Sequence, residues 1–247
     1  MTQSQYTLGI VTPTYNEISN IPILIEQLDA VLCANKIKAK LLIVDDASPD
    51  GTAFLVKELM RTFKSEYLTI DLMERSGKNG LSTAYIQGFG SIINECEFLV
   101  SLDADLSHQP KYLPQFLTLA TAHELDFVIG SRYIKGGGVE NWSLTRKLIS
   151  RFGSLYASII LGASISDFTG GYNLYRNSFV KKFDLSKSIK ATGYLFQIEM
   201  KYKMFRFGGK FIESPIIFPD RVFGESKMSG SIIKEAAIGV VKMRLTK

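Results

Sequence analysis

Cysteine and histidine are scarce in this sequence, with two of each among 247 residues. Such scarcity excludes a disulfide-stapled domain and leaves no paired Cys or His spacing of the kind that holds structural zinc. Cys33 and Cys96 each lie within a helix-like apolar pattern. We therefore expect both to be reduced thiols packed in the core of a cytosolic protein.

Long apolar runs and the common glycine-rich nucleotide motifs are also absent. The longest nearly uncharged apolar stretch, 152–165, is shorter than the roughly 20 residues that a membrane-spanning helix needs. There is no Gly-x-Gly-x-x-Gly after the first apolar run and no Gly-x-x-x-x-Gly-Lys-Ser/Thr, which excludes the dinucleotide fingerprint and the P-loop. The first six residues are polar and carry no secretory or transit signal. We expect a protein that has no transmembrane helix and stays in the cytosol.

The sequence does contain many apolar residues and an excess of positive charge. Hydrophobic residues make up 46% of the chain, enough for the core of one large domain, and the net charge is +5 at pH 7. This charge fits a protein that binds phosphorylated ligands, anionic lipid or nucleic acid. Nucleic acid is the least favoured of these, because no segment of helical period carries a dense stripe of basic and aromatic residues.

Short apolar runs alternate with segments of helical period. We predict strands at 8–11, 40–44, 68–72, 98–102 and 127–129. We predict helices at 21–32, 52–63, 81–94 and 111–122. This alternation predicts an α/β fold with a mostly parallel central sheet flanked by helices, in which the loops at the carboxyl ends of the strands bind the ligand.

Polar residues follow three of the predicted strands. A Pro-x-Tyr segment lies at 13–17, an Asp-Asp pair begins the turn at 45–52, and Asp103 and Asp105 follow the fourth strand. Carboxylate oxygens suit Mg²⁺ or Mn²⁺, which bind substrate phosphates through only one or two protein ligands. Because the phosphate-binding loops are missing, we expect a metal to hold a diphosphate at this edge of the sheet.

Two amphipathic segments lie in the second half of the chain, at 148–160 and 231–245. The first fits either a helix at a membrane interface or an ordinary core stripe. The second fits a helix that lies on a membrane or docks on a partner, or a terminal helix packed on its own domain. The sequence alone leaves both pairs of alternatives open.

A series of motifs runs in order along residues 8–230. The motifs are 13–17, 45–52, 80–85, 103–110, 130–133, 136–139, Trp142, 146–147, 150–151, 167–171, 193–200 and 220–227. Together they resemble the motifs of the dolichol-phosphate (polyprenol-phosphate) mannose synthases of glycosyltransferase family 2. The first motifs are shared by many enzymes of that family, whereas 136–142 and 220–227 look specific to the mannose synthases.

The resemblance implies an architecture and an activity. It implies a GT-A (Rossmann-like) fold in which 1–247 is one catalytic domain, with a nucleotide-sugar-binding half at about 8–130, an acceptor-binding half at about 131–230 and a C-terminal amphipathic helix at 231–247. It implies a metal-dependent inverting glycosyltransferase that uses Mg²⁺ or Mn²⁺ and transfers mannose from GDP-mannose to dolichyl or polyprenyl phosphate. Such an enzyme would be peripheral on the cytosolic face of the endoplasmic reticulum or of a prokaryotic plasma membrane. It could reach its lipid through a small membrane-anchoring subunit.

The resemblance also implies roles for individual residues. Those implied in binding the nucleotide sugar are Pro13, Tyr15, Glu17, Val44, Asp46, Asp103, Ala104, Asp105, Arg132, Arg221 and Lys227. Asp105 would hold the metal, and Ser107 stands where some members have a glutamine that assists it, so Ser107 would act through a water. Arg132, Arg146 and Ser150 would bind the acceptor phosphate. Asp105 and Arg132 are thus the implied catalytic residues.

The chemistry of such an acceptor removes the need for a strong general base. The oxygen of a phosphate monoester is already anionic at neutral pH, because its second pKa is about 6. Glu199, in a helical apolar pattern, and His108, beside the aspartates, are therefore expected to position or pack. Two other functions stay open: a polyprenyl-phosphate glucosyl- or aminoarabinosyltransferase with a UDP-linked donor, and a nucleotide-sugar-binding subunit without turnover.

Overall fold

The computed structural model describes residues 4–191, 193, 195–220 and 230–245. Its strands are β1 (Tyr6–Thr14), β2 (Ala39–Asp45), β3 (Leu68–Glu74), β4 (Cys96–Ser101), β5 (Phe127–Ser131), β6 (Gly138–Val139), β7 (Asn173–Arg176), β8 (Phe211–Pro215) and β9 (Ile217–Phe218). Its helices are α1 (Ile21–Asn35), α2 (Thr52–Thr62), α3 (Leu81–Ile92), α4 (Leu113–Ala122), α5 (Leu144–Leu161), α6 (Asn177–Phe183), α7 (Leu185–Ser188), α8 (Leu195–Arg206) and α9 (Gly230–Leu245), with a 3-10 turn, η1 (Pro110–Tyr112), before α4.

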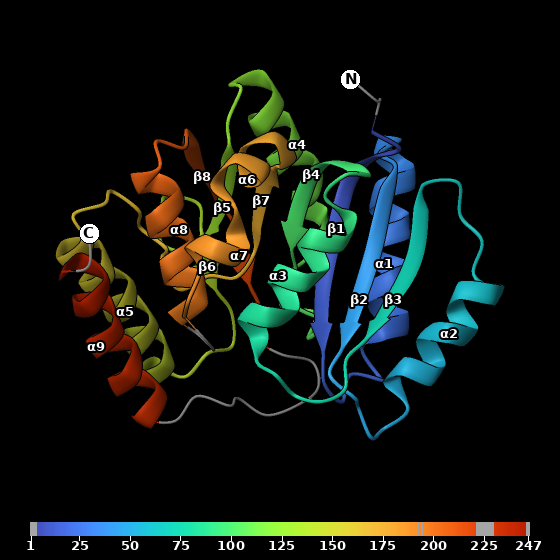
Figure 1. Cartoon of the computed structure of the whole chain (residues 1–247), viewed down its shortest axis with the longest axis horizontal. Coiled ribbons are helices and arrows are strands. Elements are labelled where there is room, and N and C mark those ends of the chain that lie inside the picture. Colours follow the sequence, from blue (N-terminus) through green and yellow to red (C-terminus); the bar gives the residue numbers. More distant parts are fainter. Residues whose placement is uncertain (1–3, 192, 194, 221–229, 246–247) are drawn as a thin grey trace.

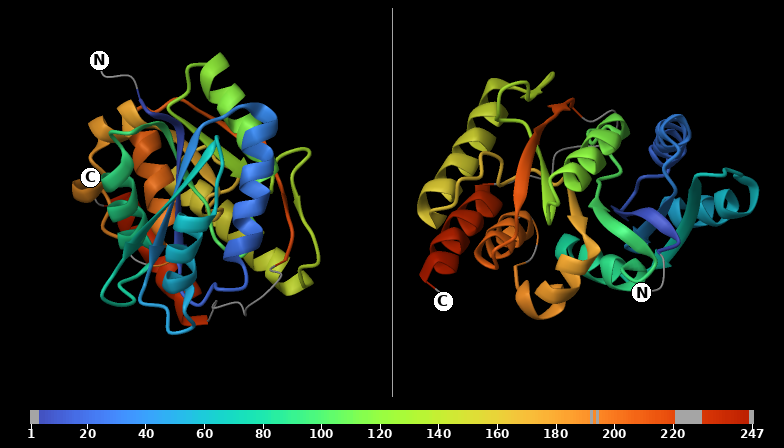
Figure 2. Two further views of the ribbon diagram at one scale, coloured as in Figure 1. Left: turned by 90° about the vertical axis from the view of Figure 1, so that its right-hand side faces the viewer. Right: turned by 90° about the horizontal axis from the view of Figure 1, so that it is seen from above.

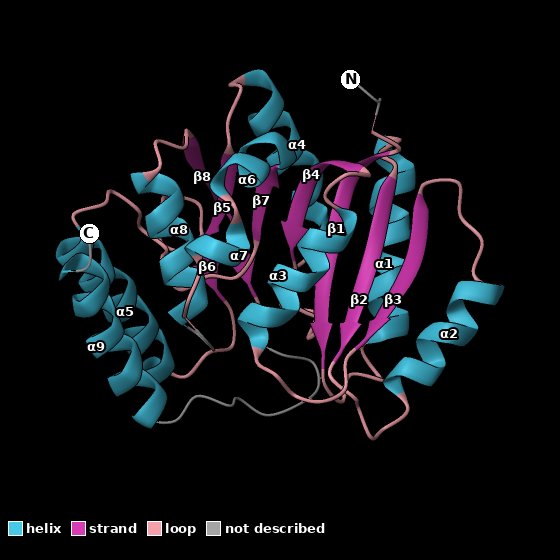
Figure 3. Ribbon diagram, viewed as in Figure 1, coloured by secondary structure: helices cyan, strands magenta, loops and turns pink. Residues whose placement is uncertain are grey.

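A seven-stranded sheet in the order β3-β2-β1-β4-β7-β5-β8 lies between layers of helices (Figure 1, Figure 3). β7 is antiparallel to both of its neighbours, and the other adjacent strands are parallel. β6 and β9 form a separate parallel pair. The predicted α/β fold with a mostly parallel sheet is confirmed.

The central strands are buried on both faces, which explains their unbroken aliphatic sequences. Leu8 and Ile10 of β1 pack with α1 and α4 on one face of the sheet, whereas Val11 packs with α3 on the other. All three side chains are fully buried. Parallel strands of this kind end at one edge of the sheet, so the loops that follow β1, β2 and β4 gather there.

Helices α5 and α9 lie side by side at one end of the molecule (Figure 2). The hydroxyl of Tyr156 on α5 donates to the carbonyl of Ala237 on α9 at 3.1 Å. On α5, five apolar side chains are more than half exposed: Leu144, Leu148, Phe152, Leu155 and Ile159. The last four belong to the predicted stripe at 148–160. The core-stripe alternative is therefore wrong for these four residues, because their side chains are not buried in the core. No helix within the described ranges is long and apolar enough to cross a membrane.

The five predicted strands and four predicted helices are present, but the expectation for the cysteines is partly wrong. Cys33 is exposed because it lies on the outer side of α1. Cys96 is buried as expected, but it is the first residue of β4 and not part of a helix. The predicted helix at 111–122 begins at Leu113, because the chain first forms η1.

Helix α3 approaches the sheet through Gly88. A Cβ added at Gly88 would lie 2.6 Å from a methyl carbon of Val11 and 3.1 Å from one of Val44. Gly88→Ala should therefore lower the free energy of unfolding by about 1–3 kcal/mol, through overpacking. Gly90→Ala is the matched control on the same helix, since a Cβ there meets no atom within 4 Å, and it should raise stability by up to about 1 kcal/mol. Urea unfolding followed by circular dichroism measures both, and equal stabilities would contradict the packing.

Candidate active site

Two aspartates lie at the carboxyl end of β4, as predicted. The hydroxyl of Tyr85 donates to Asp103 Oδ1 at 2.8 Å, and the amide of Ser107 donates to Asp105 Oδ1 at 3.2 Å. The Ser107 hydroxyl donates to the same oxygen of Asp105. Burial, together with the charge of Asp103, raises the pKa of Tyr85 well above its usual value, so Tyr85 keeps the proton that it donates. Both carboxylates are thereby oriented.

His108 supports the turn that carries these aspartates. Its Nδ1 accepts a hydrogen bond of 2.8 Å from the amide of Asp103, and its ring stacks on Tyr172 at 5.0 Å between centroids. Burial lowers the pKa of His108, against the opposing charges of Asp103 and Asp105. The neutral ring therefore packs against Tyr172 and holds the main chain at Asp103. This agrees with the packing role expected from the sequence.

The donor atoms at this edge of the sheet suit a divalent cation. Asp103 and Asp105 supply carboxylate oxygens, and Mg²⁺ or Mn²⁺ takes one or two of these together with substrate phosphates and waters. Within the described part of the chain, no three His, Cys, Asp or Glu side chains cluster as a metal site. A cation here would therefore need the substrate for further ligands. Ser107 orients Asp105, and its link to a metal through water stays a prediction.

The residues predicted to surround the nucleoside lie where β1 and β2 end. Pro13 is opposite Val44 in the parallel register, and the amide of Asp46 donates to the carbonyl of Thr14 at 3.0 Å. Asp46 Oδ1 accepts a hydrogen bond of 2.6 Å from Nε of Arg75, with both side chains buried. The carboxylate of Asp46 thus has a fixed direction at the strand end.

Tyr15 and Glu17 lie half-buried in the turn after β1. The ammonium of Lys78 lies 4.4 Å from the centre of the Tyr15 ring, and Glu17 Oε2 accepts a hydrogen bond of 2.6 Å from Asn20. An aromatic ring and a carboxylate therefore border the strand ends that are predicted to bind the nucleoside.

Other predicted nucleotide ligands are restricted by burial or cannot be placed. The side chain of Val44 is fully buried against α3, and Ala104 is 3% exposed. Any contact of Val44 with a nucleoside must come from its main chain, and in that form it stays a prediction. The predicted diphosphate ligands Arg221 and Lys227 lie outside the described residues.

Arg132, directly after β5, forms a buried ion pair with Asp167. Its Nε and Nη2 donate to the two carboxylate oxygens at 2.7 Å each, and its main-chain amide donates to Oδ2 at 3.0 Å. Burial alone would raise the pKa of Asp167, but the charge and hydrogen bonds of Arg132, with the charge of Lys201, lower it to about 2. Burial would likewise lower the pKa of Arg132, but Asp167 outweighs it and raises that pKa. Both partners are therefore ionised and fixed in direction.

The remaining donors of Arg132 face a second set of groups. Nη2 also donates to the hydroxyl of Thr169 at 2.8 Å. No described residue accepts a hydrogen bond from Nη1. The guanidinium carbon lies 5.5 Å from the centre of the Trp142 ring and 5.3 Å from that of Phe218. Arg132 thus offers one amino group to an anion in apolar surroundings.

Arg146 and Ser150 lie close to Arg132 on the first turns of α5. The guanidinium of Arg146 stacks on Trp142, 3.8 Å from the ring centre, and pairs with Asp220. The arginine is thus held over an aromatic ring by a cation–π contact. This pairing with the tryptophan was not predicted from the sequence.

The hydroxyl of Ser150 accepts a hydrogen bond of 2.6 Å from Tyr133 and lies 3.4 Å from the hydroxyl of Thr169. Because its oxygen accepts from Tyr133, its own hydrogen can be donated to another group. Ser150 therefore has a donor to offer beside the two arginines.

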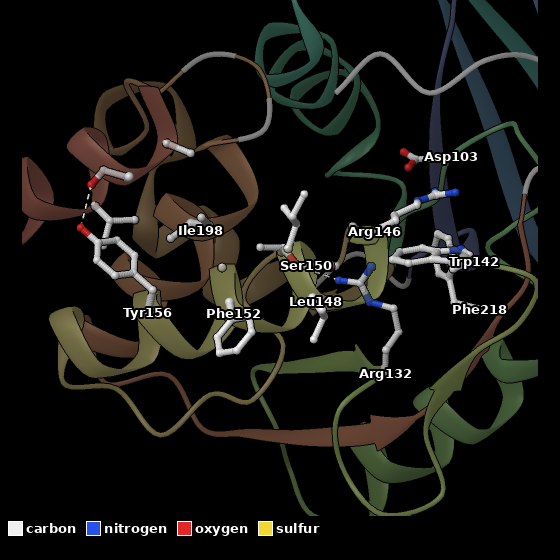
Figure 4. Close-up of a pocket in the computed structure, with 18 of the residues that line it drawn as sticks. Asp103, Arg132, Trp142, Arg146, Leu148, Ser150, Phe152, Tyr156, Ile198 and Phe218 are labelled. Carbon is white, nitrogen blue, oxygen red and sulfur yellow. Dashed lines mark hydrogen bonds between the residues drawn. The ribbon is translucent and has the colours of Figure 1, made fainter. Parts of the chain in front are cut away.

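A cavity of about 500 Å³ joins these groups. Asp103, Asp105, Arg132, Arg146 and Ser150 line it, so five predicted site residues meet there. Figure 4 shows Asp103 on one side, the arginines in the middle and apolar side chains of α5 on the other. The apolar part is lined by Leu148, Phe152, Tyr156, Ile198, Ala236, Ala237 and Val240. A ligand with an anionic head and an apolar tail matches this succession of surfaces.

Glu199 has structural partners. Its carboxylate accepts hydrogen bonds from the amides of Lys190 and Ala191 at 2.9 and 2.6 Å, and it pairs with Lys203. These contacts hold the segment before α8, which agrees with the positioning role expected for it.

Several residues with clear structural roles were not predicted. Asp167 and Tyr85 lie inside the motifs 167–171 and 80–85, so the signal was present although their partners were not identified. Arg75 and Lys201 are buried, whereas most basic residues are charges on the surface. No sequence pattern separated these two from the other basic residues.

The Arg132–Asp167 pair should be visible in acid unfolding. Asp167→Asn leaves Arg132 buried without a counter-ion and should lower the free energy of unfolding at pH 7 by about 3–5 kcal/mol. Because the folded pKa of Asp167 is depressed to about 2, its stabilisation is complete above about pH 5 and is lost as the pH falls through 2 to about 1, by about 2.5 kcal/mol in all. The difference between wild type and variant should shrink by that amount in urea titrations over this range. Asp71→Asn is the control, because Asp71 is partly exposed in its pair with Lys40. If the difference in unfolding free energy between wild type and Asp167→Asn stayed constant with pH, the buried ion pair would be contradicted.

Comparison with known proteins agrees with this geometry. Residues 9–183 match the family described as Glycosyl transferase family 2. The chain is 41% identical over 237 residues to an undecaprenyl-phosphate mannosyltransferase of Micrococcus luteus, covering 95% of this chain and 93% of that protein. It is 39% identical over 240 residues to a polyprenol monophosphomannose synthase of Mycolicibacterium smegmatis, covering 97% and 87%.

Solved structures share the fold at lower sequence identity. Glucosyl-3-phosphoglycerate synthase from Mycobacterium tuberculosis, crystallised with Mn²⁺, uridine diphosphate and glucosyl-3-phosphoglycerate, superposes with a TM-score of 0.67 at 15% identity, over 97% of this chain and 80% of that one. This likeness confirms the predicted GT-A fold. With its family match and its relatives at about 40% identity, the chain belongs to glycosyltransferase family 2, in the group that contains the polyprenol-phosphate mannose synthases.

Proposed function

We propose that the protein transfers mannose from GDP-mannose to the phosphate of a polyprenyl or dolichyl lipid, with inversion at the anomeric carbon. The observation that carries the proposal is one continuous cavity, which runs from the carboxylates after β4, past two arginines, to the apolar walls of α5 and α9. The names of the Micrococcus and Mycolicibacterium relatives support a polyprenyl-phosphate acceptor and mannose as the sugar.

The donor would lie along the ends of β1, β2 and β4. The nucleoside would be bordered by Pro13, Tyr15, Glu17, Val44, Asp46, Asp103 and Ala104, with Arg221 and Lys227 near the diphosphate. Asp105 would hold Mg²⁺ or Mn²⁺, which neutralises charge on the leaving diphosphate when bound. The hydrogen bonds from Ser107 fix the direction of the Asp105 carboxylate before the donor arrives.

The acceptor phosphate would lie between the arginines. Nη1 of Arg132, the guanidinium of Arg146 and the hydroxyl of Ser150 all supply donors beside the cavity. Planar guanidinium groups suit phosphate oxygens well. Because Asp167 holds the other side of Arg132, the guanidinium would keep its orientation when the phosphate binds, and so would determine the orientation of the phosphate.

The residues next to the site agree with a reaction that has no protein base. His108 has a pKa lowered mainly by burial, and its Nδ1 already accepts a hydrogen bond. Glu199 is engaged with main-chain amides. A phosphate dianion needs no proton removed before it attacks. The protein would therefore act by holding two anions in line and by electrostatic stabilisation.

Transfer assays test the donor and the metal ligand together. Purified protein with undecaprenyl phosphate and Mn²⁺ should form a mannosyl lipid from labelled GDP-mannose and no glycolipid from UDP-glucose. Asp105→Asn keeps the shape of the side chain and should slow transfer by about a hundredfold or more, because a positioned charge is lost. Asp71→Asn, on the edge strand β3, should retain activity within about twofold. Turnover of UDP-glucose alone would contradict the donor, and full activity of Asp105→Asn would contradict the role of that carboxylate.

The same proposal places α5 and α9 against a membrane. Exposed apolar side chains of the two helices form what we call the α5–α9 apolar surface: Leu148, Phe152, Leu155, Ile159, Ile238 and Val241. Arg151 on α5 and Lys242 and Arg244 on α9 are also exposed. Apolar side chains with nearby cations are typical of helices that lie in an anionic membrane interface.

Vesicle sedimentation tests this surface. Leu155→Glu with Ile159→Glu should reduce partition onto phosphatidylglycerol vesicles by about tenfold or more, because two apolar side chains no longer enter the interface. Neither residue lines the cavity, so transfer to farnesyl phosphate, a short soluble acceptor, should be retained. Phe54→Glu is the control, since Phe54 is 70% exposed on the distant helix α2. Unchanged partition of the double variant, or equal loss in Phe54→Glu, would contradict the membrane role.

A further inference from the structure

A lysine is completely buried beneath the turn that contains Asp167. Lys201 on α8 is 0% exposed, and its Nζ donates to the main-chain carbonyls of Asp167, Phe168 and Gly170 at 2.9, 3.1 and 2.5 Å. These three bonds use all three N–H groups of an ammonium. Lysine is almost never fully buried unless its charge is compensated. The chemistry proposed for the cavity gives Lys201 no part, so its burial needs another explanation.

The main-chain carbonyls of the turn at 167–170 accept hydrogen bonds from Lys201, and its side chains contact residues of the proposed acceptor site. The carboxylate of Asp167 and the hydroxyl of Thr169 both accept hydrogen bonds from the guanidinium of Arg132. The same hydroxyl of Thr169 lies 3.4 Å from that of Ser150. One short turn therefore connects Lys201 with two of the groups proposed to bind the acceptor phosphate.

Three main-chain carbonyls of this turn have Lys201 as their donor, whereas the amide of Gly170 is held by Asp167 Oδ1 at 2.9 Å. Three carbonyl oxygens that converge in the interior repel one another, and each would lack a donor if Lys201 were removed. Glu213 on β8 accepts from the amide of Asp167 at 3.0 Å, so it anchors only the beginning of the turn. The charged and titratable groups that face Lys201 are Asp167, Arg132, Glu213 and His108. None of them can donate to the three carbonyls in its place with the partners it already has.

We infer that Lys201 is a positioning residue. By binding the carbonyls of 167, 168 and 170, it sets the turn so that Asp167 and Thr169 hold Arg132 in the direction needed for a phosphate monoester. This inference rests on the proposed acceptor site. It assigns to the reaction a residue that lies outside the cavity and touches neither substrate.

The chain supplies a matched control and a reporter. Lys203 lies on the same helix, and its ammonium donates to the carbonyl of Ser188 and pairs with Glu199, away from the turn. Trp142 is the single tryptophan of the chain, and it lies against both Arg132 and Arg146. Its fluorescence therefore reports directly on the proposed phosphate site.

Binding of farnesyl phosphate, followed by Trp142 fluorescence at pH 7, tests the inference without turnover. Lys201→Met should weaken binding by about tenfold, because Arg132 loses its fixed direction. Lys203→Met removes a partly buried ammonium with its own carbonyl and carboxylate partners, so it should lower the thermal unfolding midpoint but leave the affinity within about twofold. If Lys201→Met binds as tightly as wild type, or if both variants weaken binding equally, the inference is overturned. If the wild-type protein does not bind farnesyl phosphate, the proposed acceptor site is wrong, and the inference that rests on it is wrong as well.

A second measurement uses the unmodified protein and so does not depend on the variant folding. Burial lowers the pKa of Lys201 to about 8, with Arg132 adding to the effect and Asp167 opposing it. The amine is charged below that pH and neutral above it, so affinity should be high at pH 7 and fall several-fold through a midpoint near 8. Asp167 and His108 have lowered pKa values and Arg132 a raised one, so Asp167 and Arg132 stay ionised and His108 stays neutral across this range. Affinity that stays constant up to about pH 9.5 would overturn the inference, and Lys203→Met should retain the transition.

Discussion

The ion pair between Arg132 and Asp167 is the interaction on which the rest of the site depends. Asp167 is completely buried and Arg132 is 6% exposed, at the wall of the cavity, so each charge is stable there chiefly because the other is present. Since both carboxylate oxygens and two guanidinium nitrogens are used, the arginine has one direction and little freedom to adjust. The cationic centre of the cavity is therefore set by the buried turn at 167–170, and not by the solvent-exposed side chains around it. A preorganised charge of this kind does not have to be reorganised when an anion arrives.

The topology of the sheet brings that turn between the two halves of the cavity. β7 runs antiparallel between β4 and β5, so the segment that leads into it lies between the aspartates after β4 and the arginine after β5. The hydroxyl of Ser101, the last residue of β4, donates to the carbonyl of Gly171 at 2.6 Å, which ties the turn to the carboxylate side. One reversed strand in an otherwise parallel sheet thus couples the proposed donor and acceptor regions.

The first half of the chain could be predicted closely, because strands buried on both faces have continuous aliphatic sequences and the helices between them have a clear period. The aspartates after β4 followed from the same reasoning, since strand ends meet at one edge. The second half was harder to predict. β7 and β8 are short, and α5 faces outward with apolar residues that resemble a core stripe in sequence. Asp167 is 35 residues from Arg132, so nothing in the sequence links the two as an ion pair. No sequence pattern distinguishes a lysine that binds buried carbonyls, as Lys201 does, from a lysine on the surface. The roles of Asp167 and Lys201 therefore became visible only in three dimensions. The resemblance to a family supplied the acceptor-phosphate roles of Arg146 and Ser150.

Helices α5 and α9 have apolar residues both towards the cavity and towards the outside of the molecule. For a catalyst seated in an interface by such helices, the acceptor would never need to enter bulk water, and the two would meet by lateral diffusion. The acceptor concentration that governs the rate is then a number of molecules per unit area of bilayer. Adding inert phospholipid would slow the reaction by surface dilution, even with the total amounts of enzyme and acceptor in the tube held constant.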